Sequence, residues 1–140
     1  MARSVRPDLA LTGDVMVAFP GETGADHVAT LDAIQRAGFT GLHVFRFSPR
    51  PRTAAARHAS QVPVAEAQER SRRTIELGDR LRAGYEAGFD GRPLRVIWDR
   101  VVDGRIRGVS ENYIQVTAPA DGRRPGELEE VVWRTACSAA

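Results

Sequence analysis

The hydrophobic pattern of this 140-residue chain changes its period near residues 90–91, and this change constrains the fold more than any other feature. Before that point, apolar residues recur every three or four positions in two segments, which is the period of an α-helix. After it, residues 92–102, 113–117 and 128–134 read as short strands separated by D-G and P-A-D-G turns. The pattern predicts a mixed α/β part followed by a small all-β module, of a size that suits a five-stranded barrel.

Residues up to about 60 predict a βαβ unit. A first strand is expected over 11–19, a helix over 23–37 and a second strand over 41–47. Two short apolar strands joined by a helix run parallel and are connected by a right-handed crossover. Within the helix, three apolar residues are expected to share one face: Val28, Leu31 and Ile34.

The ends of that helix carry start and stop signals. Thr23 and Asp26 stand three residues apart, as in a capping box with Asp in the place of Glu. Gly38 follows the last expected turn, where Gly commonly ends a helix. These signals place the helix between residues 23 and 38.

A proline-rich loop and a long helix follow the βαβ unit. The run S-P-R-P-R-T-A-A-A-R, residues 48–57, is expected to stay extended as it leaves the C-terminal end of the second strand. Residues 63–88 then predict one helix with an apolar face and a charged face. Two ion pairs at i,i+4 spacing are expected on the charged face: Glu66 with Arg70, and Glu76 with Arg80.

The stretch D-V-M-V-A-F-P-G-E-T, residues 14–23, ends a buried strand in a tight turn. It lacks the residue spacing of a phosphate loop, of a dinucleotide-binding turn and of a nucleophile elbow. Either it is only a strand-to-helix turn, or Glu22 belongs to a ligand site at the C-terminal mouth of the strand. The S-P-R-P-R-T loop leaves the neighbouring strand at the same end, so both interpretations stay open here.

Arginine supplies the whole positive charge of the chain. All twenty basic residues are Arg, and residues 92–124 hold seven of them against four acidic residues. Small β-barrels bind single-stranded RNA through surfaces that combine cations with aromatic rings, and the run G-V-S-E-N-Y (108–113) lies near several of these arginines. The alternative is that Trp98 and Trp133 form a core and the arginines only solvate the module.

Cysteine count and hydropathy exclude several classes of protein. The only Cys is Cys137, so this chain can form no internal disulfide and no Cys-based metal centre. The three His residues show no ligand-like spacing, so no metal site is expected. The sequence has no run of 18 apolar residues and no signal-peptide segment, which predicts a cytoplasmic protein without membrane contact.

Taken in order, the motifs resemble one family. The runs are R-P-D-L-A-L-T-G-D-V-M-V-A-F-P-G-E-T, G-F-T-G-L-H-V-F-R-F-S-P-R-P-R-T-A-A-A-R, Q-V-P, F-D-G-R-P-L-R-V and E-N-Y. Over nearly all of the chain they resemble the C-terminal half of radical S-adenosylmethionine (SAM) tRNA methylthiotransferases. The run L-H-V-F favours the branch that acts on N6-threonylcarbamoyladenosine at position 37 of tRNA over the branches that act on isopentenyladenosine or a ribosomal protein.

The resemblance implies a fold class and a division of the chain. Residues 1–62 would be the C-terminal part of a partial (β/α) radical SAM barrel, residues 63–90 a connecting helix, and residues 91–140 a small OB-like, RNA-binding β-barrel, the TRAM domain. It also implies tRNA as the partner, SAM and [4Fe–4S] clusters as cofactors of the full-length enzymes, and transfer of a 2-methylthio group as the reaction. The cluster motif C-x-x-x-C-x-x-C is absent, so this chain alone is expected to hold no cluster and to carry no catalytic residue.

Site residues follow from the same resemblance. Four would face the ligand end of the barrel and orient SAM or the adenosine: Asp14, Glu22, Ser48 and Arg50. Five would contact RNA: Arg95, Arg105, Arg107, Asn112 and Tyr113. Two positions depart from the family pattern, because Ala18 and Arg52 stand where relatives usually carry Gly. Arg52 puts the tight turn of its loop in doubt, since Gly adopts positive φ without steric cost.

An isolated barrel edge poses a physical problem. Its first strand would be left with an unpaired edge and an uncovered apolar face, both of which favour aggregation. The chain is therefore expected to be one piece of a split enzyme whose N-terminal half is a partner, or a non-functional truncated product. A further alternative is a stand-alone RNA-binding module whose barrel remnant is only scaffold.

Overall fold

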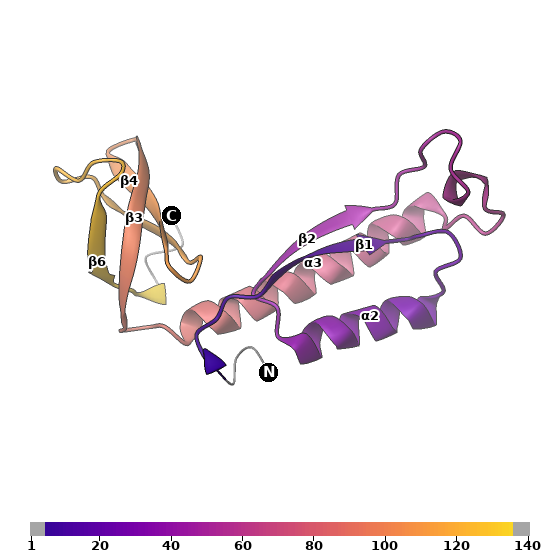
Figure 1. The fold of residues 1–140 in the computed structure, drawn as a ribbon, viewed down its shortest axis with the longest axis horizontal. Helices are drawn as coiled ribbons and strands as arrows, with labels where there is room; N and C mark the ends of the chain where they lie inside the picture. Colours follow the sequence, from indigo (N-terminus) through magenta and orange to yellow (C-terminus); the bar gives the residue numbers. More distant parts are fainter. Residues whose placement is uncertain (1–4, 136–140) are drawn as a thin grey trace. The chain divides into compact units, whose positions relative to one another are not determined.

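The computed structural model describes residues 5–135, which divide into two compact units (Figure 1). One, called here the α/β unit, comprises residues 11–83. The other, called the β unit, combines residues 5–10 with residues 84–135. The short N-terminal segment therefore packs with the β-rich end of the chain, although some 75 residues separate the two in sequence.

The α/β unit contains the predicted βαβ arrangement. Strand β1 (Thr12–Val17) and strand β2 (Gly41–Arg46) are parallel, and helix α2 (Gly24–Ala37) connects them. Met16 lies opposite Phe45 in the register, and both are about half exposed, at 55% and 51%. In the residues described, one face of this two-stranded sheet therefore carries exposed apolar side chains.

Helix α2 begins and ends where its signals predict. The Thr23 hydroxyl accepts a hydrogen bond from the Asp26 amide, and the Thr23 amide donates to the Asp26 carboxylate at 2.8 Å, which completes the capping box. Gly38 closes the helix with a φ of 68°. The predicted buried face is partly wrong, because Val28 is exposed and His27 takes the inner position beside Ile34.

Helix α3 (Val64–Ala87) confirms the second predicted helix and packs directly against α2. The buried His27 Nε2 lies 3.1 Å from the Thr74 hydroxyl, which itself donates to the Arg70 carbonyl at 2.8 Å. The predicted pair of Glu66 with Arg70 is present, whereas Glu76 pairs with Arg72, four residues before it, in place of the predicted Arg80, four residues after it. Within residues 5–135, neither helix is both long and apolar enough to cross a membrane.

The β unit is built on one antiparallel sheet. Its strands are β3 (Pro93–Val102), β4 (Arg105–Ser110), β5 (Gln115–Pro119) and β6 (Leu128–Val132), in the order β5-β4-β3-β6. The three predicted strand segments are confirmed, but β4 was missed. The described residues form an open four-stranded sheet in place of the five-stranded barrel that the pattern predicts.

The inner face of this sheet carries the core of the β unit. Both tryptophans belong to it, because Trp98 and Trp133 are 1% exposed. Each indole N–H is paired: Trp98 donates to a Glu129 carboxylate oxygen at 2.8 Å, and Trp133 donates to the Glu86 carbonyl at 3.1 Å. Of the two readings of the tryptophans, the core reading is correct.

Candidate nucleic-acid interface

Four arginines lie on the outer face of the β3–β4 sheet. Arg107 stands directly opposite Arg100, and Arg105 stands opposite Val102. Arg95 alternates with buried neighbours on β3, as Arg107 does on β4. Because side chains of directly opposed residues share a face of the sheet, these cations point away from the core together. Arg95, Arg105 and Arg107 are predicted RNA contacts, and Arg100 lies on the same face with them.

A β-bulge explains why Arg100 joins this surface. The register of β3 against β4 shifts between Trp98 and Arg100, so that Asp99 is an extra residue. Without the bulge, Arg100 would share the inner face with Trp98, two positions before it. Because of the inserted residue, Arg100 points outward, whereas strict alternation would direct it toward the core.

Apolar side chains accompany the arginines. Ile97 faces Val109 on one side and Leu128 on the other, and Ile97 and Leu128 are largely exposed. With Arg95 and Tyr113 they line a shallow hollow of about 390 Å³. Cations mixed with exposed apolar and aromatic groups are what sequence-tolerant binding of single-stranded nucleic acid requires.

The arginines of this face are weakly neutralised. Arg95 lies 3.8 Å from Glu111 and Arg100 lies 3.9 Å from Asp99, and both guanidinium groups are mainly exposed. Such surface pairs contribute little. Within residues 5–135, Arg105 and Arg107 form no ion pair, and the buried Arg105 Nε has no hydrogen-bond partner. The face therefore retains positive charge for an anionic partner.

The turn between β4 and β5 carries the other two predicted RNA contacts. The Tyr113 amide donates to the Ser110 carbonyl at 2.9 Å, and the Arg95 amide donates to the Glu111 carboxylate at 2.8 Å. The first bond closes the turn, and the second ties it to β3. Asn112 is only 8% exposed, whereas the Tyr113 ring is 69% exposed and has a backbone φ of 62°.

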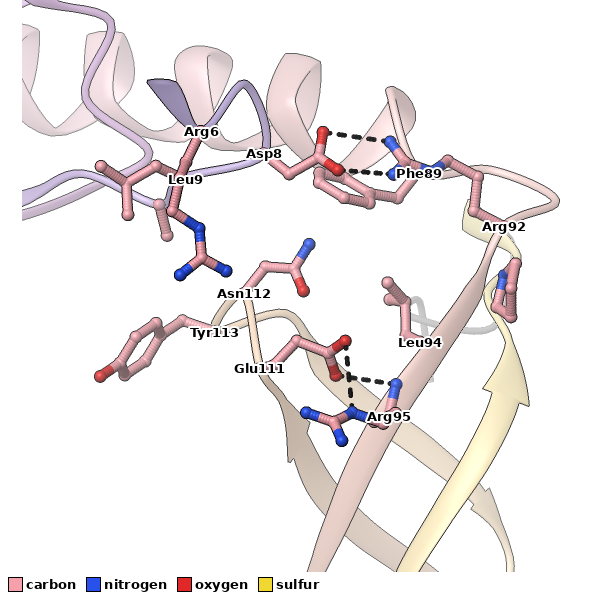
Figure 2. Close-up of a pocket in the computed structure, with 12 residues that line it drawn as sticks. Arg6, Asp8, Leu9, Phe89, Arg92, Leu94, Arg95, Glu111, Asn112 and Tyr113 are labelled. Atoms are coloured by element: carbon pink, nitrogen blue, oxygen red, sulfur yellow. Dashed lines mark hydrogen bonds and ion pairs between the residues drawn. The ribbon is translucent and has the colours of Figure 1, made fainter. Parts of the chain in front are cut away.

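Arg95, Asn112 and Tyr113 line one cavity, whose volume is about 310 Å³ (Figure 2). Residues 6–10, 89–95 and 111–113 line it. Arg105 and Arg107 lie on β4 outside this cavity. The structure thus brings three of the five predicted RNA contacts together and places the other two on the adjoining sheet face.

Sequence reasoning missed the wall that the N-terminal segment contributes. Asp8 and Arg92 form a bidentate ion pair, with distances of 2.6 and 3.2 Å between the guanidinium nitrogens and the carboxylate oxygens. The Tyr85 hydroxyl donates a hydrogen bond to the Asp8 carbonyl at 2.7 Å. The hydrogen bond from Arg92 lowers the pKa of the Asp8 carboxyl. Arg92 also lies over the Phe89 ring, 4.6 Å from its centre. No periodic signal could reveal a contact between residues 84 positions apart.

Glu22, the most prominent of the predicted ligand-side residues, is held in a buried network. Its carboxylate lies 2.7 Å from the Arg70 guanidinium, and the two side chains are 13% and 5% exposed. Its second oxygen accepts a hydrogen bond from the Phe19 amide, and Arg70 also contacts Glu66. Burial alone would lower the pKa of Arg70, but the hydrogen bonds to Glu66 and Glu22 raise it. The pair fastens the turn after β1 to α3.

The remaining ligand-side residues lie apart from one another. Asp14 is exposed on the open face of β1, opposite His43. Ser48 lines a hollow of about 640 Å³, and Arg50 is exposed in the following loop. The lining of the Ser48 hollow includes none of the other three, Asp14, Glu22 and Arg50.

Two departures from the family pattern have a structural counterpart. Ala18 and Arg52, expected to replace Gly, have φ values of 61° and 69°. Both therefore adopt the left-handed conformation that favours Gly. The loop keeps its turn with Arg at position 52, which answers the doubt that the sequence raised.

The described residues offer no ligand set for a metal. Residues 5–135 contain no group of three or more His, Cys, Asp or Glu side chains placed to hold an ion. Cys137 lies outside the described residues. The chain's single Cys does not fit an iron–sulfur cluster, because such clusters are held by several Cys thiolates.

The chain is similar in sequence to enzymes that modify tRNA. It is 35% identical over 130 residues to the threonylcarbamoyladenosine tRNA methylthiotransferase of Thermotoga maritima, a match that covers 92% of this chain and 30% of that protein. It is 35% identical over 131 residues to the tRNA-2-methylthio-N(6)-dimethylallyladenosine synthase of Jannaschia sp., covering 92% and 28%. It is 41% identical over 139 residues to the same-named enzyme of Kineococcus radiotolerans, covering 92% and 27%.

The matches cover nearly all of this chain but less than a third of each relative. No family model matches the chain. The chain spans about 30% of the length of the curated relatives it matches, so their activity as whole enzymes is not thereby its own. Across nearly all of its own length, however, the relationship is consistent and involves several relatives. By this homology, the chain corresponds to a part of the tRNA methylthiotransferases.

Proposed function

We propose that this chain acts in tRNA modification by supplying the tRNA-binding surface of a methylthiotransferase. In this proposal residues 91–140 are the TRAM-type RNA-binding module, residues 63–90 connect it, and residues 1–62 form the last strands of a radical SAM barrel. The observation that carries the proposal is the outer sheet face, where four arginines stand among exposed apolar side chains. Homology to tRNA-modifying enzymes supports tRNA as the anionic partner.

The catalytic chemistry is proposed to require a part of the family's enzymes that these 140 residues do not contain. The clusters and most of the SAM site would come from an N-terminal half, because this chain has one Cys. Ser48, Arg50 and Asp14 are proposed to face SAM or the target adenosine. Glu22, whose carboxylate is engaged by Arg70, is proposed to position the turn beneath them.

The substrate of the assembled enzyme is proposed to be N6-threonylcarbamoyladenosine at position 37, in the anticodon loop of tRNA. The threonylcarbamoyladenosine enzyme of Thermotoga maritima and the L-H-V-F run support this branch. The test supplies the N-terminal part of that enzyme together with this chain. Methylthiolation of tRNA carrying threonylcarbamoyladenosine, and not of tRNA carrying dimethylallyladenosine, is expected. The reverse preference would assign the chain to the branch that acts on dimethylallyladenosine.

Binding of tRNA is tested first, since it needs only this chain. Fluorescence anisotropy with labelled tRNA at increasing salt should give a linear fall of log affinity against log salt concentration. Arg107→Ala should weaken binding and reduce the slope by about one phosphate contact. Arg36→Ala, which removes an exposed cation of α2 paired with Asp32, is the matched control and should leave the slope unchanged. An affinity for tRNA that does not depend on salt concentration would contradict the proposed electrostatic binding.

A stand-alone RNA-binding module is the second candidate. The same arginine face supports it, because that surface needs nothing from a barrel. Salt-dependent tRNA binding without any methylthiolation in the presence of a supplied N-terminal half would favour this candidate. A chain that neither binds tRNA nor complements would be a non-functional product.

A further inference from the structure

We infer that the cavity lined by residues 6–10, 89–95 and 111–113 takes one unstacked RNA base, with adenine preferred, and that Asn112 reads the edge of that base. This inference rests on the proposed RNA binding and deepens it. The sheet face described above tolerates any sequence, whereas this cavity adds discrimination at one nucleotide. All of its walls belong to the β unit.

Asn112 is the central observation. Its side chain is 8% exposed, and within residues 5–135 its amide makes no hydrogen bond with protein. Figure 2 shows the amide directed into the cavity. The side-chain amide of Asn112 is not among the fully buried unpaired side-chain atoms of residues 5–135, so it is open to the cavity and can bond a ligand there. A ligand edge would supply the partner that the protein does not.

The chemistry of an amide selects the ligand edge. The Asn side chain presents a donor and an acceptor side by side in one plane. Adenine presents the complementary pair, an exocyclic amine beside a ring nitrogen, and Asn bonded to both is the usual way in which side chains recognise adenine. Guanine and uracil lack an amine beside an acceptor nitrogen at their Watson–Crick edges, whereas cytosine has one such edge, N4 with N3, and adenine has two, N6 with N1 and N6 with N7. Adenine therefore offers the Asn112 amide more ways to bond than any other base.

Tyr113 supplies a surface on which a base can stack. Its ring is 69% exposed at the rim of the cavity, and its φ of 62° is left-handed, where a bulky residue is strained. Asn or Gly would fit that backbone better, so the turn tolerates strain while it presents an aromatic ring. Unstacked RNA bases are commonly held between such rings and hydrogen bonds to their edges.

The charges around the cavity suit the phosphates that flank one base. The Arg6 guanidinium lies beside Asn112 in Figure 2, and Arg95 lines the opposite side. The two carboxylates that line the cavity are both engaged by arginines, Asp8 by Arg92 and Glu111 by Arg95. A volume of about 310 Å³ lies at the small end of ligand pockets, which suits one base better than a larger ligand.

The test measures the affinity of the chain for single-stranded RNA oligonucleotides of oligouridine with one central A, G, C or U. Wild-type protein should bind the A-containing oligonucleotide about five- to hundredfold more tightly than the all-uridine one. Asn112→Asp, which replaces the donor with an acceptor, should abolish that preference. Tyr113→Phe should keep the affinity and Tyr113→Ala should lower it about five- to hundredfold, because the ring is the contact.

An atomic substitution in the RNA removes any dependence on how the variants fold. Purine riboside at the central position lacks the exocyclic amine of adenosine, so wild-type protein should lose its preference for it while Asn112→Ala binds both alike. An unchanged preference in Asn112→Ala would overturn the inference, as would equal losses with all four bases. Salt-dependent binding without base discrimination overturns only this inference, whereas no binding of any oligonucleotide overturns the proposed function itself.

Discussion

Removal of the Arg70 guanidinium should strongly destabilise the α/β unit. Arg70→Met keeps a helix-forming residue with an unbranched stem of similar reach. It deletes the 2.7 Å contact with the Glu22 carboxylate, the 3.0 Å hydrogen bond to the Glu22 carbonyl and the contact with Glu66. Glu22 would be left 13% exposed with no cation beside it, held at the turn that follows β1.

The size of the effect follows from the burial of each partner. Breaking a buried ion pair from one side costs about 3–5 kcal/mol, mainly because the other charge stays buried and unpaired. Glu66 is 48% exposed, so its share is only about 0.3–0.5 kcal/mol. We expect Arg70→Met to lower the free energy of unfolding by about 3 kcal/mol, nearly all of it because the Glu22 carboxylate stays buried without its partner. Glu22→Gln combined with Arg70→Met should recover at least half of the loss, because no buried charge remains.

Urea denaturation followed by circular dichroism at the helix band is the assay, because both long helices begin in the α/β unit while both tryptophans report on the β unit. Arg72→Met is the matched control on the same helix. Arg72 also contacts two carboxylates, those of Glu69 and Glu76, but it is 57% exposed. Arg72→Met should therefore lower the free energy of unfolding by less than about 1 kcal/mol. Equal losses for the two variants, or a loss under about 1 kcal/mol for Arg70→Met, would refute the reasoning.

Three further outcomes are expected. Arg52→Gly should raise the free energy of unfolding by about 1 kcal/mol, since it relieves a left-handed φ of 69° at an exposed position; a lower urea midpoint would contradict this. Burial lowers the pKa of His27 below 6.5, so the unfolded chain binds a proton that the folded chain does not. Stability should therefore fall as the pH drops below about 6.5, and His27→Gln should flatten that part of the urea-midpoint profile. Gly108→Ala should cost more than about 2 kcal/mol by tryptophan fluorescence, because the added Cβ would lie 2.5 Å from the Ile97 carbonyl, whereas Gly84→Ala meets no atom within 4 Å and serves as control.

The sequence predicts the local features of this fold well. The caps of α2 are an example, since Thr23, Asp26 and Gly38 act within one or two turns of the residues they stabilise. The parallel pairing of β1 and β2 was also predictable, because a helical crossover between short strands leaves little choice. The sequence also predicts in part that residues 110–113 lie between two strands. Asn112 and Tyr113, which line the cavity, belong to this segment.

The features that were missed depend on contacts distant in sequence. Strand β4 has Gly108 at an inner position, where the side chain of Trp98 fills the space, so its apolar alternation is broken in the sequence. The bulge at Asp99 likewise appears only when β3 is set against β4. The wall made by Asp8 and Arg92 joins two distant parts of the chain, and although each residue lies in one of the quoted motifs, no pattern in the sequence pairs them. Such features require the tertiary structure.

The direct opposition of Arg100 and Arg107 has a practical consequence for handling the protein. Like charges placed opposite each other on neighbouring strands repel. Within residues 5–135, the carboxylate that pairs with Arg100 is that of Asp99, 3.9 Å away, and Arg107 forms no ion pair. A polyanion laid across the two strands would relieve the repulsion and stabilise the folded state by mass action. Cellular nucleic acid should therefore copurify with the chain, and stripping it with high salt should lower the melting temperature once the salt is dialysed away.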